Sequence, residues 1–296
     1  MELHGLIKKY PDDKELGEKV RFLANSLSDR SNGGSSQTIP IIQDGVSCWI
    51  ILDHWQGTMH GLPMGESLTY LRIKYQTNWL GVIHIGAHKA EEMSGYAQNG
   101  IQNVIWVEPQ ESLYLQILTK IQQESFDKMN QQVLNALIGS EDGLEVEFNE
   151  YGGSTNNDGY LGSSSILKMS SKHIDYIKKW KKNRGQNHNE RAITGKTIKQ
   201  IYTWDFIVKS NKIDMKKYPL LVVDVEGYEL HVLQGMKDSL KFVDCAILEC
   251  SVLSQLREGG TTLKDLDLFM IKNGFERVEL HVQCGNAEGD AVYLRK

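Results

Sequence analysis

Residues 79–109 decide the fold, and they read WLGVIHIGAHKAEEMSGYAQNGIQNVIWVEP. The apolar runs at 79–86 and 103–109 are continuous, which is typical of strands buried on both faces of a parallel sheet. The residues between these runs predict a helix that ends at Gly100. The stretch therefore predicts a β-α-β unit, from which α/β folds are built.

The alternation of helix and strand continues along the chain. Further helices are expected over 112–122, 229–240 and 263–273, further buried strands over 133–139, 220–227 and 245–250, and a final hairpin over 275–283 and 290–296. The alternating residues 143–151 are typical of a half-exposed antiparallel strand. Together these patterns predict a doubly wound α/β domain from about residue 80 to residue 296.

Two parts of the chain do not follow this alternation. Residues 152–199 include GGSTNNDGYLGSSS and predict a long irregular segment, which is usually functional or disordered. Residues 39–56 predict two strands around Asp44-Gly45, a hairpin signal. We expect residues 1–60 to form an N-terminal extension that makes an oligomer or substrate contact, and residues 61–296 to form one domain.

Composition excludes several classes of protein. A net charge of -5 gives no overall attraction to nucleic acid, and the basic run 178–184 is better explained as a solvated helix face than as a phosphate site. The four cysteines form no CxxC pair, so reduced thiols are expected rather than zinc ligands or disulfides. No apolar run has the length of a signal peptide or a membrane span, which predicts a cytoplasmic location.

The turn after the first buried strand indicates the kind of ligand. In an open parallel sheet, ligands bind beyond the carboxyl ends of the strands. The small residues of Gly86–Ala90 would let backbone N–H groups approach a ligand at a helix N-terminus. Only the first glycine of the dinucleotide pattern GxGxxG is present, because His88 occupies the second glycine position and Glu91, after Ala90, the third. An adenosine cofactor without phosphate, S-adenosylmethionine, is therefore expected.

Two other strand ends supply candidate cofactor contacts. Glu108 follows the second strand about 22 residues after Gly86, near the spacing at which an acidic residue accepts hydrogen bonds from ribose hydroxyls. The alternative role for Glu108 is a helix N-cap. Ala136 is a small residue at a strand end, where an adenine ring could lie flat.

Carboxylates end the two later strands. Asp224 is interpreted as the base or orienting group for an attacking hydroxyl, with a helix cap as the alternative. Glu226 is a supporting or exposed group in the same reaction zone. Glu249 would face the same crevice, and with Asp224 it would contact sugar hydroxyls or hold a divalent cation, although a metal is not favoured.

Hydroxyl and imidazole groups add further candidates. Ser163, Ser164 and Ser165 would line a polar substrate pocket, or else solvate a linker. His84 and His88 flank the first turn, and either could move a proton near neutral pH. For His84, a satisfied strand-end residue is the favoured alternative.

The chain resembles the FkbM-type S-adenosylmethionine-dependent methyltransferases. The shared motifs are VIHIGAHKAEE, WVEP, NALIGSEDGLEVEF, GSSSIL, YTWDF, VVDVEGYELHVLQGM and AILEC, in family order. The resemblance implies a Rossmann-like, mostly parallel seven-stranded sheet with helices on both faces and a final antiparallel strand. It also implies methylation of a hydroxyl, typically on a sugar.

The resemblance also assigns roles by position. The cofactor residues it implies are Gly86, Ala87 and His88 for the methionine part, Glu108 and Pro109 for the ribose side, Ala136 for the adenine side, and His84 and Asp224 nearby. Asp224 and Glu226 would lie in the reaction zone. The family often has an acidic residue at the position of His84.

These observations predict an O-methyltransferase that acts on a hydroxyl of a sugar in a glycan or small natural product. The expected partner is a small-molecule or glycan acceptor, and a homo-oligomer is left open. Two alternatives remain: a non-catalytic module that binds a nucleoside or glycan, and a nicotinamide-dependent oxidoreductase on the same fold.

Overall fold

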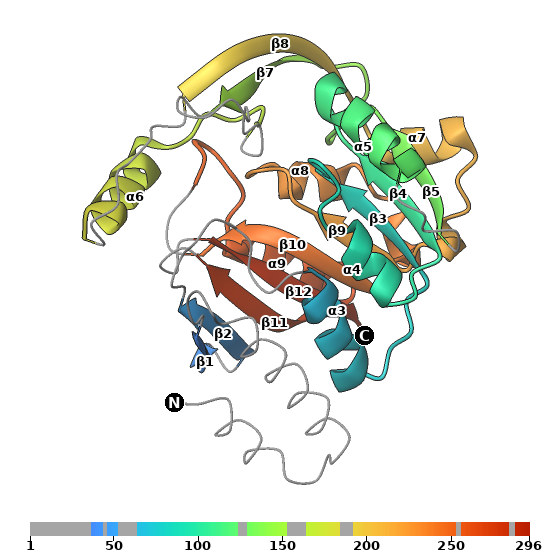
Figure 1. Ribbon diagram of the computed structural model, residues 1–296, viewed down its shortest axis with the longest axis horizontal. Helices are drawn as coiled ribbons and strands as arrows, with labels where there is room; N and C mark the ends of the chain where they lie inside the picture. The colour runs from blue at the N-terminus through green and yellow to red at the C-terminus, as the bar shows by residue number, and fades with distance from the viewer. Residues whose placement is uncertain are drawn as a thin grey trace, which may run out of the picture.

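The computed structural model describes residues 37–43, 46–52, 64–123, 129–152, 164–183, 192–252, 256–283 and 288–296. Figure 1 shows a central sheet that runs through the molecule and a smaller group of strands that arches above it. None of the described helices is long and apolar enough to cross a lipid bilayer.

The main sheet has nine strands in the order β1-β2-β11-β12-β10-β9-β3-β4-β5. Their bounds are β1 Gln37–Gln43, β2 Val46–Leu52, β3 Gly81–Ile85, β4 Asn103–Val107, β5 Asn130–Leu134, β9 Leu220–Val223, β10 Cys245–Ser251, β11 Phe275–Gln283 and β12 Glu288–Arg295. The five strands from β5 to β10 are parallel, and β12 is antiparallel to both β10 and β11. The predicted seven-stranded Rossmann-like sheet is confirmed in the strands from β11 to β5.

Strands β1 and β2 enlarge this sheet at its β11 edge. They pair with each other antiparallel, and β2 pairs with β11 in parallel, with Leu280 opposite Cys48. Asp44 and Gly45, which predicted the turn between them, lie outside the described residues. The N-terminal hairpin therefore adds two strands to the predicted seven.

Helices cover both faces of the sheet. They are α3 Met64–Lys74, α4 Met93–Gln98, α5 Glu111–Gln123, α7 Trp204–Asn211, α8 Glu229–Gln234 and α9 Leu263–Lys272. Another helix, α6 Ser171–Asn183, lies away from the main sheet (Figure 1). Val82 of β3 packs with α3, α4 and α5 on one face. Its neighbour Ile83 packs with α7, α8 and α9 on the other face. This alternation buries the strand on both sides, as its apolar run predicts.

The prediction of one strand over 133–139 is wrong. Strand β5 ends at Leu134, and Leu137–Ile138 form β6 in a second sheet of order β6-β8-β7. Between them, the Asn135 side chain donates to the carbonyls of Glu108 and Pro109 at 2.9 and 3.2 Å, which turns the chain away from the main sheet.

The prediction of an irregular segment over 152–199 is only partly right. Strand β8, Ala192–Tyr202, pairs with β7, Glu145–Gly152, and α6 lies between them in sequence. Residues 153–163 and 184–191 lie outside the described residues. Figure 1 shows β7 and β8 arching above the carboxyl ends of the central strands. This inserted sheet forms one wall of the candidate site.

Candidate active site

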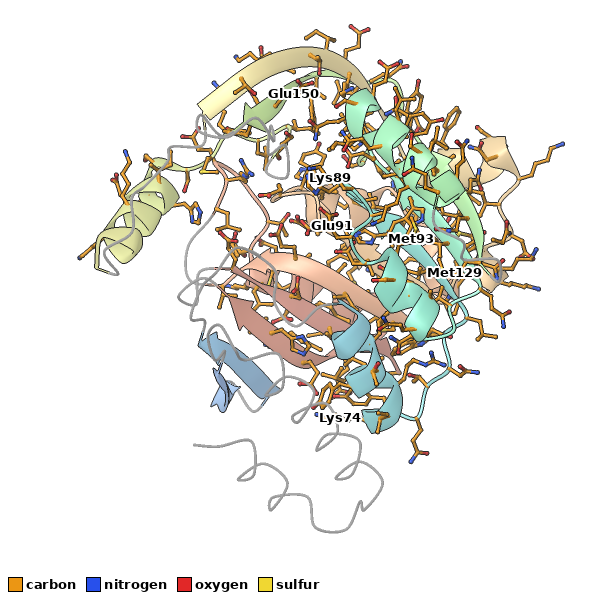
Figure 2. All side chains as sticks on the ribbon, viewed as in Figure 1. Lys74, Lys89, Glu91, Met93, Met129 and Glu150 are labelled. Atoms are coloured by element: carbon orange, nitrogen blue, oxygen red, sulfur yellow. The ribbon has the colours of Figure 1, made fainter. Side chains whose placement is uncertain are left out.

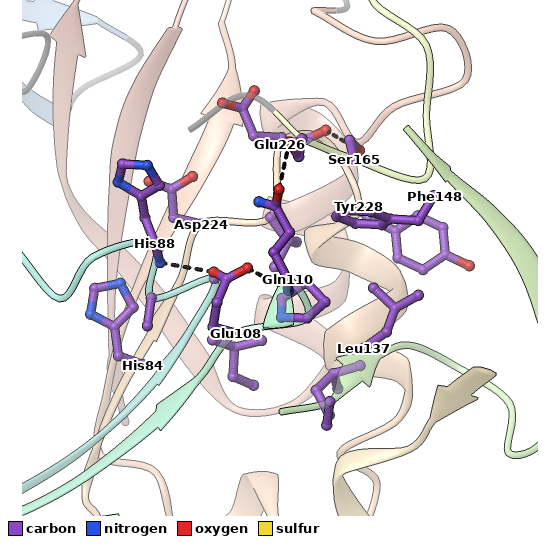
Figure 3. Close-up of a pocket in the computed structure, with 18 of the residues that line it drawn as sticks. His84, His88, Glu108, Gln110, Leu137, Phe148, Ser165, Asp224, Glu226 and Tyr228 are labelled. Carbon is purple, nitrogen blue, oxygen red and sulfur yellow. Dashed lines mark hydrogen bonds between the residues drawn. The ribbon is translucent and has the colours of Figure 1, made fainter. Parts of the chain in front are cut away.

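A pocket lies at the carboxyl ends of β3, β4 and β9. The parallel part of the sheet begins at β3, continues outward through β4 and β5, and resumes with β9 on the other side of β3, so this is the point where the strand order reverses. The pocket lining includes most residues singled out from the sequence, namely His84, Gly86, Ala87, His88, Glu108, Pro109, Ala136, Ser164, Ser165, Asp224 and Glu226. Figure 3 shows His84, His88, Glu108 and Asp224 on one side and Leu137, Phe148 and Tyr228 on the other.

The turn after β3 is held by its own backbone. The N–H groups of Gly86 and Ala87 donate to the Val107 carbonyl at 2.9 and 3.0 Å, and His88 N donates to Glu108 Oε2 at 2.9 Å. These N–H groups therefore bond within the protein, whereas the sequence analysis expected them to approach a ligand. The predicted helix is also shortened to α4, because His88 and Ala90 have φ values of 47° and 51°, in the left-handed region.

Glu108 is buried under this turn. Its Oε1 accepts a hydrogen bond from Gln110 N at 2.8 Å, so each carboxylate oxygen already holds one backbone N–H. Burial raises the pKa of Glu108 to about 7, although these N–H groups oppose the shift. Because a carboxylate oxygen has two lone pairs, Glu108 can still accept a bond from a ligand in the pocket.

The two histidines have different surroundings. His84 is 4% exposed, its Nδ1 lies 2.9 Å from the Tyr96 hydroxyl, and burial lowers its pKa to about 4. His84 is therefore neutral at pH 7. His88 Nδ1 lies 2.6 Å from an oxygen of Glu91, which sits on the turn before α4 (Figure 2). Burial opposes ionisation of Glu91, but the His88 and backbone bonds outweigh it and lower its pKa to about 2.

The opposite side of the pocket is apolar. Ala136, Leu137 and Ile138 lie there with Phe148 of β7 and Tyr228. Phe148 is buried and packs with Leu137 and Tyr228 in one cluster. No local pattern indicates that Phe148 would reach this pocket, because only the pairing of β7 with β8 brings it there. The resulting surface suits a flat ring.

Two serine hydroxyls join the segment after residue 163 to the pocket walls. Ser164 Oγ donates to Gln110 Oε1 at 3.3 Å and accepts from Tyr151 N at 3.2 Å. Ser165 Oγ donates to the Glu226 carbonyl at 3.0 Å, a bond drawn in Figure 3. Ser163 lies outside the described residues. Ser164 and Ser165 thus hold this segment across the pocket.

Asp224 directly follows β9, and Glu249 lies near the end of the neighbouring strand β10. Val223 pairs with Leu248, so the two residues that follow them, Asp224 and Glu249, lie abreast. Burial, followed by the surrounding negative charges, raises the pKa of both groups well above their ordinary values. Asp224 lines the pocket, whereas Glu249 lies behind it and is not part of the lining.

The alternative role of Asp224 as a helix cap is wrong. Helix α8 begins at Glu229, and its N-cap residue is Tyr228, with no side-chain cap. The turn is held instead by Glu229, whose Oε1 accepts from Gly227 N at 2.8 Å and from Val225 N at 3.3 Å. The carboxyl group of Asp224 is therefore available to the pocket.

The carboxylates at this site do not form a metal centre by themselves. Among the residues that the structure describes, no group of three or more His, Cys, Asp or Glu side chains is arranged to hold a metal ion.

Arg257 is a charged partner of Glu226 that the sequence did not reveal, because Arg257 lies in a segment without regular pattern. Its Nη2 donates to Glu226 Oε2 at 2.5 Å.

Comparisons with known proteins identify one family and a set of similar folds. The family model described as "Methyltransferase FkbM domain" matches residues 84–277. No curated protein sequence matches the chain.

Among solved structures, three similar ones are bacterial proteins. Magnesium protoporphyrin IX methyltransferase (ChlM) from Synechocystis PCC 6803, solved with bound SAM, is 9% identical, with 79% of this chain and 78% of that chain covered at a TM-score of 0.42. A candidate tRNA (m1A22) methyltransferase, Sp1610 from Streptococcus pneumoniae, is 10% identical, with 77% and 69% covered at a TM-score of 0.41. A protein of the NADB-Rossmann superfamily from Streptococcus agalactiae is 11% identical, with 81% and 71% covered at a TM-score of 0.41.

Proposed function

Because the chain belongs to the FkbM methyltransferase family, we propose that it uses S-adenosylmethionine to methylate a hydroxyl group of a sugar, in a glycan or small natural product. The observation that carries the choice of cofactor is the charge of the pocket. Its described lining contains Glu91, Glu92, Glu108, Asp224 and Glu226 but no Lys or Arg. Such a lining favours a cationic sulfonium over the pyrophosphate of a nicotinamide dinucleotide.

The lining offers a place for each part of this cofactor. Glu108 would accept hydrogen bonds from the ribose hydroxyls, and the turn at Gly86–His88 would contact the methionine part. Ala136 and Phe148 would flank the adenine ring, with Pro109 beside the ribose. When bound, S-adenosylmethionine supplies an electrophilic methyl group.

The chemical task of the protein is to orient a hydroxyl and accept its proton. Asp224 would take this proton on its carboxylate, and Glu249, which lies beside it, would hold Asp224 in place. A pKa raised by burial makes Asp224 a stronger base than an exposed aspartate. Ser164, Ser165 and Glu226 lie at the same opening and would contact the acceptor.

Two measurements test this proposal. Calorimetry should detect binding of S-adenosylhomocysteine and no binding of NAD. Mass spectrometry should then detect a gain of one methyl group on a member of a panel of uncharged sugars and hydroxylated natural products. Binding of NAD alone would identify the site as an oxidoreductase site, and cofactor binding without turnover on any acceptor would favour a binding module.

Replacing Glu108 by glutamine should weaken S-adenosylhomocysteine binding at least about tenfold. The amide would place an NH₂ group against a backbone N–H donor, either His88 N or Gln110 N, and would remove one acceptor. Leaving a buried donor unsatisfied also costs about 1–3 kcal/mol of stability. Calorimetry and urea unfolding would measure the two effects, with exposed Glu111→Gln as the control. Unchanged affinity would remove Glu108 from the cofactor site.

On acidification, the rate of methyl transfer should fall at a higher pH than it would if the base were an aspartate with an ordinary pKa. A base acts only when deprotonated, and the pKa of Asp224 lies well above the usual value of about 3.9. Activity is therefore lost as the pH falls through that raised pKa. A profile of kcat between about pH 5 and 9, with cofactor affinity measured in parallel, would test this. A rate that stays constant down to pH 5 would contradict it.

A further inference from the structure

Arg257 is a cation that the structure places against one carboxylate of the pocket, that of Glu226. It lies between β10 and α9, its side chain is 1% exposed, and its Nη2 bonds to Glu226 Oε2 at 2.5 Å. Glu226 lines the pocket, whereas Arg257 lies behind it. A buried arginine that is not part of the pocket lining therefore bonds to a residue that is.

The backbone around Glu226 is shaped for this contact. Glu226 has a φ of 57°, a left-handed conformation that is strained for a residue other than glycine. The next residue is Gly227, where a Cβ atom would lie only 2.7 Å from Arg257 Cγ. The Gly227 carbonyl accepts bonds from Thr261 N and Thr261 Oγ1, at 2.8 and 3.0 Å. The turn and the Arg257 segment thus fit closely together.

Arg257 also contacts the inserted sheet. Its guanidinium lies over the Tyr151 ring, 5.1 Å from the ring centre, and its backbone forms an isolated bridge with Met169. Tyr151 in turn accepts a hydrogen bond from Met169 N at 3.1 Å. Arg257 therefore joins the β9–α8 turn, β7 and the segment after residue 163, which are three of the pocket walls.

Stability alone does not explain this arrangement. Burying an ion pair costs desolvation that its attraction only partly recovers, so an apolar pair of similar volume is often as stable or more stable. The negative groups that face Glu226 are Asp224, Glu229 and Glu249, and each of them is affected by its charge. Arg257 balances the negative charge of Glu226 itself, at the edge of the pocket.

We propose that Arg257 is a positioning residue that neutralises Glu226 and so limits how strongly the carboxylates around Asp224 and Glu249 hold a positive charge in the pocket. The proposal rests on the proposed function. Unbalanced carboxylates would stabilise a cationic cofactor more than its neutral product and would slow methyl transfer. Arg257 removes part of that bias while keeping the Glu226 carboxylate in a fixed position.

The test is the ratio of the affinities for S-adenosylmethionine and S-adenosylhomocysteine, which differ in charge at sulfur. A unit charge acting across a pocket at an effective dielectric constant of about 20 changes an affinity by roughly tenfold, and salt reduces this. Calorimetry at pH 8 and low salt should show that Arg257→Met shifts the ratio about fivefold toward S-adenosylmethionine. Arg257→Lys should keep the ratio within about twofold of the starting protein.

A second substitution separates charge from packing. In the double variant Arg257→Met with Glu226→Gln, the unbalanced charge is gone, so the ratio should return to that of the starting protein. A merely structural role for Arg257 would not be rescued in this way. The matched control is Arg277→Met, because Arg277 is also largely buried and pairs with Asp267 at 2.9 Å, outside the pocket lining. Arg277→Met should leave the ratio unchanged.

The outcomes distinguish this inference from the proposed function. If the starting protein binds neither compound, the proposed function fails. If it binds both and Arg257→Met leaves the ratio unchanged, or the double variant does not restore it, the role of Arg257 is overturned and the cofactor assignment stands. If Arg257→Met does not fold, the ratio in Arg257→Lys decides: a shift beyond about twofold, with charge retained, contradicts the proposal.

Discussion

Replacing Asp224 by asparagine should lower kcat for methyl transfer by about 10²- to 10⁴-fold, the usual contribution of a general base. Asparagine keeps the size of the side chain but cannot take a proton at neutral pH. The affinity for S-adenosylhomocysteine should change little, since a neutral carboxamide fits the same space beside Glu249. Steady-state rates with the acceptor identified from the panel, together with calorimetry, would measure both quantities.

The control for this variant is Asp238→Asn. Asp238 is exposed and lies outside the pocket lining, so its loss should leave both rate and affinity unchanged. Full activity of Asp224→Asn from acid to alkaline pH would show that another group accepts the proton. Because burial keeps His84 neutral at pH 7, it would then be the next residue to replace.

Gly86→Ala should abolish cofactor binding and destabilise the domain by several kcal/mol. Gly86 has a φ of 89°, and a Cβ atom there would lie 1.7 Å from the Asp224 carbonyl oxygen. The φ alone costs an L-residue about 1–3 kcal/mol, and the overlap forces the ends of β3 and β9 apart. Urea unfolding and calorimetry with S-adenosylhomocysteine would measure the two effects.

Gly100→Ala is a matched control for that change. Gly100 also has a positive φ, 71°, but a Cβ atom there would meet nothing within 4 Å. The Gly100→Ala variant should lose only the part of the free energy of unfolding that φ strain accounts for, and it should bind the cofactor normally. If the two variants were equally stable, the close approach of Gly86 to Asp224 would have no energetic role.

The parallel core could be predicted because its strands are self-evident in sequence. Residues such as Val82 and Ile83 are both buried, so β3 reads as an unbroken apolar run that only a sheet covered on both faces explains. Once the strands are known, their ends define one edge of the sheet. The neighbouring positions of Asp224 and Glu249 follow from that rule and are confirmed by the pairing of Val223 with Leu248.

The other walls of the site depend on long-range contacts that no local pattern reports. Strand β8 was missed because its exposed residues, including Ile198, give no clear alternation, and it is defined by pairing with β7. Phe148 reaches the pocket only through that pairing. Arg257 meets Glu226 across 31 residues of chain, through a turn whose shape depends on Gly227. Sequence alone placed the carboxylates but not the groups that surround them.

The position of β12 has a consequence for how the chain is synthesised. This strand is the last of the nine strands of the sheet to be synthesised, yet it lies between β10 and β11, which are both made earlier. Until it arrives, β10 and β11 present unpaired backbone edges that can join other chains. The sheet of the nascent protein therefore stays divided until β12 is made, and a premature stop after Gln283 would leave the sheet divided rather than merely shortened.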